Sequence, residues 1–208
     1  MPAIKKINRE DIIKASVEII RKEGLESLNA RGVAKKLNCS TQPIFYIYSN
    51  MEEMRKDALK EISRIFDDAM FKSNYDKIAY KDIGVNYIRF AKEEPILFKI
   101  LFNSKSNEQA LCFIDLKGSS NKIWETISNQ TGLSKKEAKN LHLKMWLYVN
   151  GIANLVANNT CNFTKEEIEK LLEEQYISML LFEIQKGNIR REVLDNVLKN
   201  KLKRKEEM

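Results

Sequence analysis

Side chains capable of acid–base, nucleophilic or metal chemistry are few in this chain of 208 residues. It contains one histidine, His142, and three widely separated cysteines, Cys39, Cys112 and Cys161. These residues lack the paired Cys/His spacing of a zinc site, and an odd, dispersed set of cysteines favours reduced thiols over a disulfide framework. The sequence also lacks the glycine-rich, nucleophile-elbow and His-Glu-x-x-His motifs of common enzymes. We therefore expect no catalytic site, no metal and no cofactor.

The formal net charge is +7, and the basic excess lies at the two ends of the chain. Residues 1–50 carry nine basic and five acidic side chains, and residues 186–208 carry eight and four. Residues 51–185 are nearly neutral, with nineteen basic and twenty acidic side chains. A basic N-terminal segment favours a polyanion partner, with a solubilising surface as the alternative. Neither a membrane-spanning apolar run nor a signal peptide is visible, so a cytoplasmic location is expected.

Almost every segment has the apolar spacing of an α-helix, and none alternates long enough to be a strand. Few prolines and glycines also argue against a β-sandwich or barrel. The pattern predicts an all-α fold with one boundary, at which a three-helix unit (residues 1–50) meets a larger helical domain (residues 51–208). The residues expected to cap helix N-termini are Asn8, Asn29, Ser40, Asn50, Ser134 and Thr164. The other helices are expected at residues 78–93, from Pro95 onward and, least clearly, at 108–131.

The stretch from Asn29 to Tyr46 has the spacing of a helix-turn-helix, with a turn at Asn38 and Cys39. Its first short helix should pack across the second. The side chains expected to hold the two helices together are Val33, Ala34, Leu37, Ile44 and Phe45. The second helix could then lie in a DNA major groove with its N-terminal side chains at the base edges.

At this point the chain resembles a known family. Residues 27–54, SLNARGVAKKLNCSTQPIFYIYSNMEEM, are similar to the signature of the TetR family of bacterial transcriptional regulators. The resemblance covers about residues 8–60. A second short element, running from Trp146 to Gly151, is similar to a Trp-x-x-x-His-Gly element of one C-terminal subgroup, with Asn150 where histidine is usual. The resemblance implies a ligand-responsive repressor that binds double-stranded operator DNA as a homodimer and is released by a small-molecule effector.

The resemblance also implies specific DNA contacts. Arg31 would reach a base edge, because a guanidinium can pair bidentate with guanine. The peptide amides after Asn29 would face a phosphate, as helix N-termini do. Thr41, Gln42 and Pro43 would open the recognition helix, with Gln42 able to pair with adenine and Pro43 able to contact a thymine methyl.

Tyr46 and Tyr48 would reach phosphate oxygens, which position a protein on DNA without reading its sequence. Burial in the core is the alternative for both tyrosines. Phe45 stands where the family usually has tyrosine, so a packing contact is expected there without a hydroxyl contact. Met51 stands where a phosphate-binding lysine is common. The cations expected to compensate for that lysine are Lys5, Lys6, Arg9 and Lys56.

For the C-terminal domain, the resemblance implies a small-molecule pocket and a dimer formed by the helices near 134–158 and 164–185. The second of these helices carries more apolar surface than one core face needs, with burial inside the monomer as the alternative. An apolar or aromatic effector suits the candidate pocket side chains, which ordinary packing would also explain. These candidates are Tyr87, Phe90, Phe98, Trp124, His142, Met145, Trp146 and Asn150.

One other class of function remains open. A helical protein-interaction adaptor that has lost specific DNA binding would also explain the departures at Phe45 and Met51. The two functions differ in salt dependence, because DNA binding through several phosphates weakens steeply as salt rises.

Overall fold

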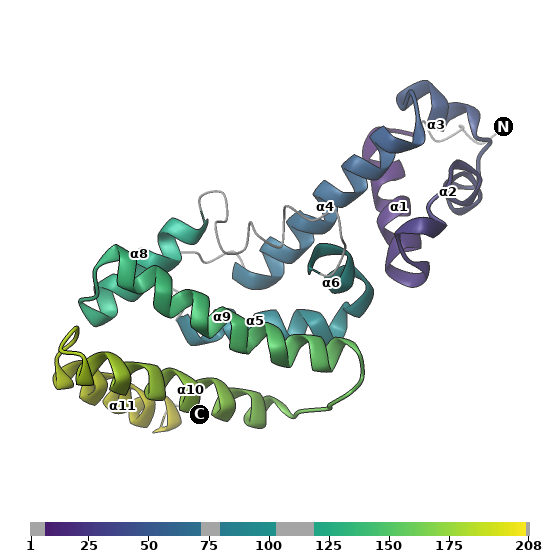
Figure 1. Cartoon of the computed structure of the whole chain (residues 1–208). Coiled ribbons are helices and arrows are strands. Elements are labelled where there is room, and N and C mark those ends of the chain that lie inside the picture. Colours follow the sequence, from purple (N-terminus) through teal and green to yellow (C-terminus); the bar gives the residue numbers. More distant parts are fainter. Residues whose placement is uncertain (1–6, 72–79, 103–118, 207–208) are drawn as a thin grey trace.

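The computed structural model describes residues 7–71, 80–102 and 119–206, and every regular element in these ranges is helical (Figure 1). This confirms the predicted all-α fold class. The elements are α1 (Arg9–Glu23), the short 3₁₀ helix η1 (Leu25–Ser27), α2 (Ala30–Leu37), α3 (Gln42–Ile47), α4 (Met51–Phe71), α5 (Tyr80–Glu93), α6 (Pro95–Phe102), α8 (Ser119–Thr131), α9 (Lys135–Ala157), α10 (Lys165–Gln185) and α11 (Arg191–Glu206). The basic C-terminal segment is therefore helical.

Side-chain caps explain where most of these helices begin. Complete capping boxes start α1, α9 and α10, as the sequence predicts; they pair Asn8 with Asp11, Ser134 with Glu137, and Thr164 with Glu167. The expected cap at Ser40 is wrong, because α3 begins one residue later, with Thr41 in the cap position and no side-chain bond. Asn50 does cap α4, accepting a hydrogen bond from the Glu53 amide at 2.9 Å.

Helix α4 links the two ends of the molecule (Figure 1). Its N-terminal part packs against α1, and its C-terminal part packs against α5 and α6. Phe66 in α4 makes edge-on ring contacts with Phe90 and Phe102, both at 5.1 Å between centroids. The division at Asn50 remains a prediction, because α4 contributes to both cores.

Helix α5 is the centre of the C-terminal part and lies against α4, α9 and α10. A glycine permits this close approach: a Cβ atom at Gly84 would lie 3.1 Å from Leu172 Cδ1 in α10 and 3.5 Å from Val149 in α9. Helix α11 then packs on α10. Within the described ranges, no helix combines the length and apolar character needed to cross a membrane.

Candidate functional site

The first candidate site is the pair of short helices α2 and α3. Asn29 caps α2 by accepting the Gly32 amide at 2.8 Å, and Asn38 ends it in the left-handed conformation, with φ of 55°. Val33 and Ala34 of α2 and Ile44 of α3 are all buried. These features produce a helix-turn-helix, as the spacing from Asn29 to Tyr46 predicts.

The outer face of α3 is largely free of packing. Tyr46 is 92% exposed and Phe45 is 54% exposed, and Gln42 is also exposed. The expectation that Phe45 packs between the two helices is therefore wrong; Ile44 fills that position. Arg31 is exposed on α2, whereas Thr41 and Pro43 are half-buried. Helix α3 lies at one end of the molecule, remote from α10 and α11 (Figure 1).

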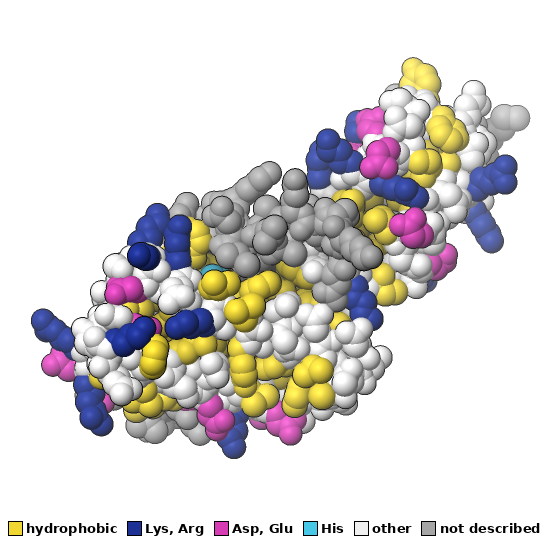
Figure 2. Space-filling view, viewed as in Figure 1, with side chains coloured by type: hydrophobic (Ala, Val, Ile, Leu, Met, Phe, Trp, Pro, Cys, Tyr) yellow, Lys and Arg dark blue, Asp and Glu magenta, His cyan; other side chains and the backbone are white. Residues whose placement is uncertain are grey.

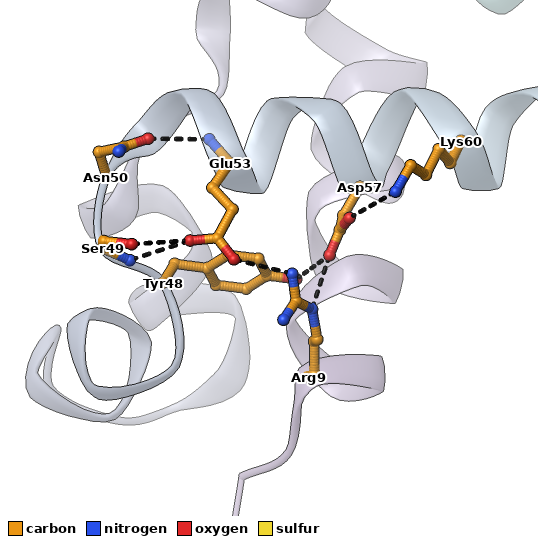
Figure 3. A network of polar contacts seen from close by, with 7 residues as sticks. All are labelled: Arg9, Tyr48, Ser49, Asn50, Glu53, Asp57 and Lys60. Carbon is orange, nitrogen blue, oxygen red and sulfur yellow. Dashed lines mark hydrogen bonds and ion pairs between the residues drawn. The ribbon is translucent and has the colours of Figure 1, made fainter.

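A polar network holds α3 in place from behind (Figure 3). The hydroxyl of Tyr48, the residue that ends α3, donates to Asp57 of α4 at 3.2 Å. Arg9 of α1 donates to Asp57 at 2.6 Å and to Glu53 at 2.9 Å, and its guanidinium lies 4.7 Å from the centre of the Tyr48 ring. The Glu53 carboxylate also accepts bonds from the backbone and hydroxyl of Ser49. Two helices, α1 and α4, and the turn that follows α3 therefore meet in one cluster.

This network changes the role expected of two residues. Tyr48 is 1% exposed and its hydroxyl is already bonded, so a phosphate contact by Tyr48 is a wrong expectation. Arg9 is paired with two carboxylates and is not available as a free compensating cation. Met51 is half-buried against the core, and Lys56 is exposed. The predicted contacts Lys5 and Lys6 lie outside the described residues.

The contacts within the network favour the ionised form of its two carboxyl groups, Glu53 and Asp57. Burial would raise the pKa of Asp57, but the hydrogen bonds from Arg9 and Tyr48 outweigh it and hold that pKa below its ordinary value. Burial, followed by the charge of Asp57, raises the pKa of Tyr48 to about 12. The Ser49 hydrogen bonds lower the pKa of Glu53. At neutral pH the cluster therefore contains two carboxylates, a guanidinium and a neutral phenol.

The second candidate site is a cavity of about 1050 Å³ that is partly open to solvent and is lined by residues of α5, α8, α9, α10 and α11. Aromatic side chains form much of its wall: Tyr80, Tyr87, Trp146 and Tyr176. His142 also lines it, and the Tyr80 hydroxyl lies 3.0 Å from His142 Nδ1. Burial lowers the pKa of His142 to about 4, so its imidazole is neutral at pH 7.

The structure brings only part of the predicted pocket together. Tyr87, His142, Met145 and Trp146 line the cavity. Four other candidates do not line it, namely Phe90, Phe98, Trp124 and Asn150. These four have packing or bonding partners elsewhere.

Each excluded candidate has a structural role. Phe90 and Phe98 belong to the aromatic core between α4, α5 and α6. Trp124 is buried in α8 beneath the Lys139 amine, which lies 4.0 Å from its ring centre. Asn150 accepts the Tyr87 hydroxyl at 3.0 Å. Tyr176 is not among the predicted pocket residues; it lies on the helix near 164–185, whose apolar surface favoured an interface.

A third feature is apolar surface on α9 and α10, where hydrophobic side chains gather (Figure 2). The exposed large residues there are Leu147, Leu155, Leu181 and Phe182. Phe182 is flanked by the amines of Lys144 and Lys186, at 5.3 and 4.5 Å from its ring centre. It also lines a shallow groove between the two helices.

Comparison of the sequence with protein-family models and with curated proteins finds no match. Comparison of the structure with solved structures does. A TetR-like transcriptional regulator from Rhodococcus sp. RHA1 is 14% identical, with a TM-score of 0.57 over 83% of this chain and 96% of that one. A TetR-family regulator from Haemophilus influenzae RD is 19% identical, with a TM-score of 0.57 over 81% and 93%.

A third similar structure is the multidrug binding protein EbrR complexed with malachite green. It is 11% identical, with a TM-score of 0.54 over 81% of this chain and 97% of that one. These matches cover nearly the whole of each neighbour and more than four fifths of this chain. The chain therefore has the fold of the TetR family of transcriptional regulators.

Proposed function

We propose that this protein is a transcriptional repressor that binds operator DNA through α2 and α3 and is released by a small molecule. The observation that carries the proposal is an outward-facing α3, held from behind by the Arg9–Asp57–Tyr48 network, in a chain with the TetR fold. Residues 1–50 would bind DNA, and residues 51–208 would bind the effector and dimerise. An enzymatic role has no support in the sites described above.

The proposed DNA-contacting set follows from exposure. Arg31 and Gln42 would read base edges, and Tyr46 would reach a phosphate. Phe45 joins the set, because an exposed ring on the recognition helix can contact a thymine methyl. The first amides of α2, after Asn29, have no partner within the helix and would face a phosphate. Thr41 and Pro43 would lie at the start of α3.

We propose that α9 and α10 form the homodimer interface. Their exposed leucines and Phe182 form apolar surface that a second copy of the chain could cover. A dimer would place two recognition helices on one DNA duplex, as paired half-sites require. Leu181→Glu is expected to give a monomer by light scattering coupled to gel filtration. Leu198→Glu, which changes an exposed leucine on α11, should leave the dimer intact; a dimeric Leu181→Glu variant would contradict this interface.

The cavity would receive the effector; the similar structure of the multidrug binding protein EbrR is a complex with malachite green, which supports a small-molecule ligand. Coupling to the DNA-binding end has two structural routes. Helix α4 runs from the network to the aromatic core beside the cavity, and α6 contacts α1. Arg21 of α1 also donates to Glu94, next to α6, at 2.9 Å. An effector that favours one arrangement of α4 and α6 would change the distance between paired recognition helices.

DNA binding is tested by fluorescence anisotropy with the DNA immediately upstream of the protein's own coding region. We expect saturable binding that exceeds binding to scrambled DNA. Because phosphates contribute, affinity should fall by on the order of a hundredfold or more between about 50 and 200 mM salt. Arg31→Ala should weaken binding roughly tenfold or more, as should Tyr46→Ala. Arg191→Ala, an exposed arginine on α11, is the matched control and should change little.

The exposed Phe45 also supports one alternative, a helical adaptor whose α3 docks on another protein. An adaptor would give no DNA-dependent anisotropy at any salt concentration. That outcome would overturn the proposed DNA-binding function and favour the adaptor.

A further inference from the structure

The cavity contains polar groups that its own walls do not satisfy. His142 is 6% exposed, and its Nε2 atom is buried without a hydrogen-bond partner among the described residues. The buried hydroxyl of Tyr176 also has no such partner. An unpaired buried donor is costly, so a native structure that keeps two of them in one cavity indicates a missing partner.

These two groups lie in the same part of the cavity. Both rings pack against Tyr80, with centroid separations of 5.9 Å for His142 and 5.7 Å for Tyr176. We assign the Tyr80 hydroxyl as the donor to His142 Nδ1, the acceptor within its reach. The neutral imidazole then carries its proton on Nε2. His142 and Tyr176 both line the cavity, and each carries a buried donor without a partner among the described residues.

The charged side chains that line the cavity disfavour an anionic ligand. The two lysines that line the cavity are already paired, Lys81 with Glu169 at 3.2 Å and Lys170 with Glu174 at 3.9 Å. The remaining charged lining residues are acidic, including Asp82 and Glu166. A bound anion would find neither a free lysine nor a charged histidine among the described lining residues, and desolvating it would be unfavourable.

We propose that the cavity binds a ring-containing molecule without a negative charge through a carbonyl-type acceptor, which takes hydrogen bonds from His142 Nε2 and the Tyr176 hydroxyl. This inference rests on the proposed function, in which the same molecule is the effector. The aromatic wall supplies stacking and edge contacts for the rings. The volume of about 1050 Å³ accommodates several fused or linked rings.

The test uses three naphthalene probes and the full-length protein without DNA. Prodan, 6-propionyl-2-dimethylaminonaphthalene, is uncharged and has a ketone. 2-Dimethylaminonaphthalene lacks the ketone, and 8-anilinonaphthalene-1-sulfonate is an anion. Fluorescence titration should give prodan the highest affinity, about tenfold or more above the sulfonate, because the described lining residues offer no free cation to an anionic group.

Tyr176→Phe is the variant of choice, because it removes one hydroxyl without leaving another group unpaired. We avoid His142→Leu, because it would strip Tyr80 of its partner and endanger folding. Tyr176→Phe should weaken prodan about fivefold and leave 2-dimethylaminonaphthalene within about twofold. Tyr148→Phe, on α9 but away from the cavity lining, is the control and should leave both unchanged.

Unchanged prodan affinity in Tyr176→Phe would overturn the proposal, as would sulfonate binding that equals prodan binding. DNA binding by the ligand-free protein is measured separately. A protein that binds its upstream DNA but fails the prodan test retains the proposed function and loses this inference.

Discussion

In the helix-turn-helix region, the buried hydroxyl of Tyr48 donates to Asp57 at 3.2 Å; in the cavity, the buried hydroxyl of Tyr176 has no partner among the described residues. The network of the first region pairs Arg9, Tyr48 and Asp57 with one another. Under the proposals above, the second would use its unpaired donors to bind a ligand. The proposed function would then combine a pre-organised DNA-reading end with a sensing end that ligand binding completes.

The largest expected effect concerns pH. His142 has its pKa lowered to about 4 by burial, whereas the unfolded chain has a pKa near its ordinary 6.5. Between these values the unfolded state binds more protons, so stability falls as pH falls through this window. Lowering the pH from 7 to about 4 should cost about 3 kcal/mol of unfolding free energy through His142 alone.

Urea unfolding of the wild type and of His142→Gln at both pH values measures this contribution. Other acidic groups titrate in both proteins and cancel in the comparison. The variant should lose less stability than the wild type; equal losses would show that His142 is not buried neutral in the folded protein.

The next effect concerns the network. Asp57→Ala should lower the unfolding free energy by about 2 kcal/mol, because it leaves the Tyr48 hydroxyl buried and unpaired. It should also weaken operator binding, because α3 loses its support. Asp68→Ala, an exposed carboxylate of α4, is the matched control and should have little effect on either. An operator affinity unchanged by Asp57→Ala would contradict the proposal that the network supports α3 for DNA binding.

The smallest effect is also the most direct comparison of the two regions. Replacing tyrosine by phenylalanine should change the unfolding free energy differently in the two regions. Tyr48→Phe should lower the unfolding free energy by about 1 kcal/mol, because it removes a bond to Asp57. Tyr176→Phe should leave it unchanged or raise it by up to about 1 kcal/mol, because the hydroxyl has no hydrogen-bond partner among the described residues. Equal losses in the two variants, measured by urea unfolding, would break the comparison.

Local signals in the sequence predicted much of the fold. Capping pairs such as Ser134 with Glu137 placed helix starts, because a cap needs only residues within one turn. The turn between α2 and α3 was predicted by the same local chemistry at Asn38. The cap of α3 failed because Thr41 there makes no side-chain bond, and its start depends on packing instead.

The two sites were harder to predict, because the residues that contact one another in each site are distant in the sequence. Arg9 reaches Glu53 and Asp57 across more than forty residues, so it resembled a free cation of a basic arm. Periodicity could not distinguish the cavity from the aromatic core, because His142 and Phe98 both lie on buried helix faces. Tyr176 lies on the helix near 164–185, whose apolar surface the sequence analysis relates to a dimer interface.

The most direct test of the central claim is a hydroxyl-radical footprint of the protein on the DNA upstream of its coding region. A homodimer with outward-facing recognition helices should protect two symmetric half-sites. Their centres should lie about one helical turn apart, roughly 34 Å, or a multiple of it. Protection of two such half-sites by the wild type, lost in Tyr46→Ala, is the predicted result. No protection at low salt would contradict DNA binding, and a single unpaired protected site would contradict the dimer.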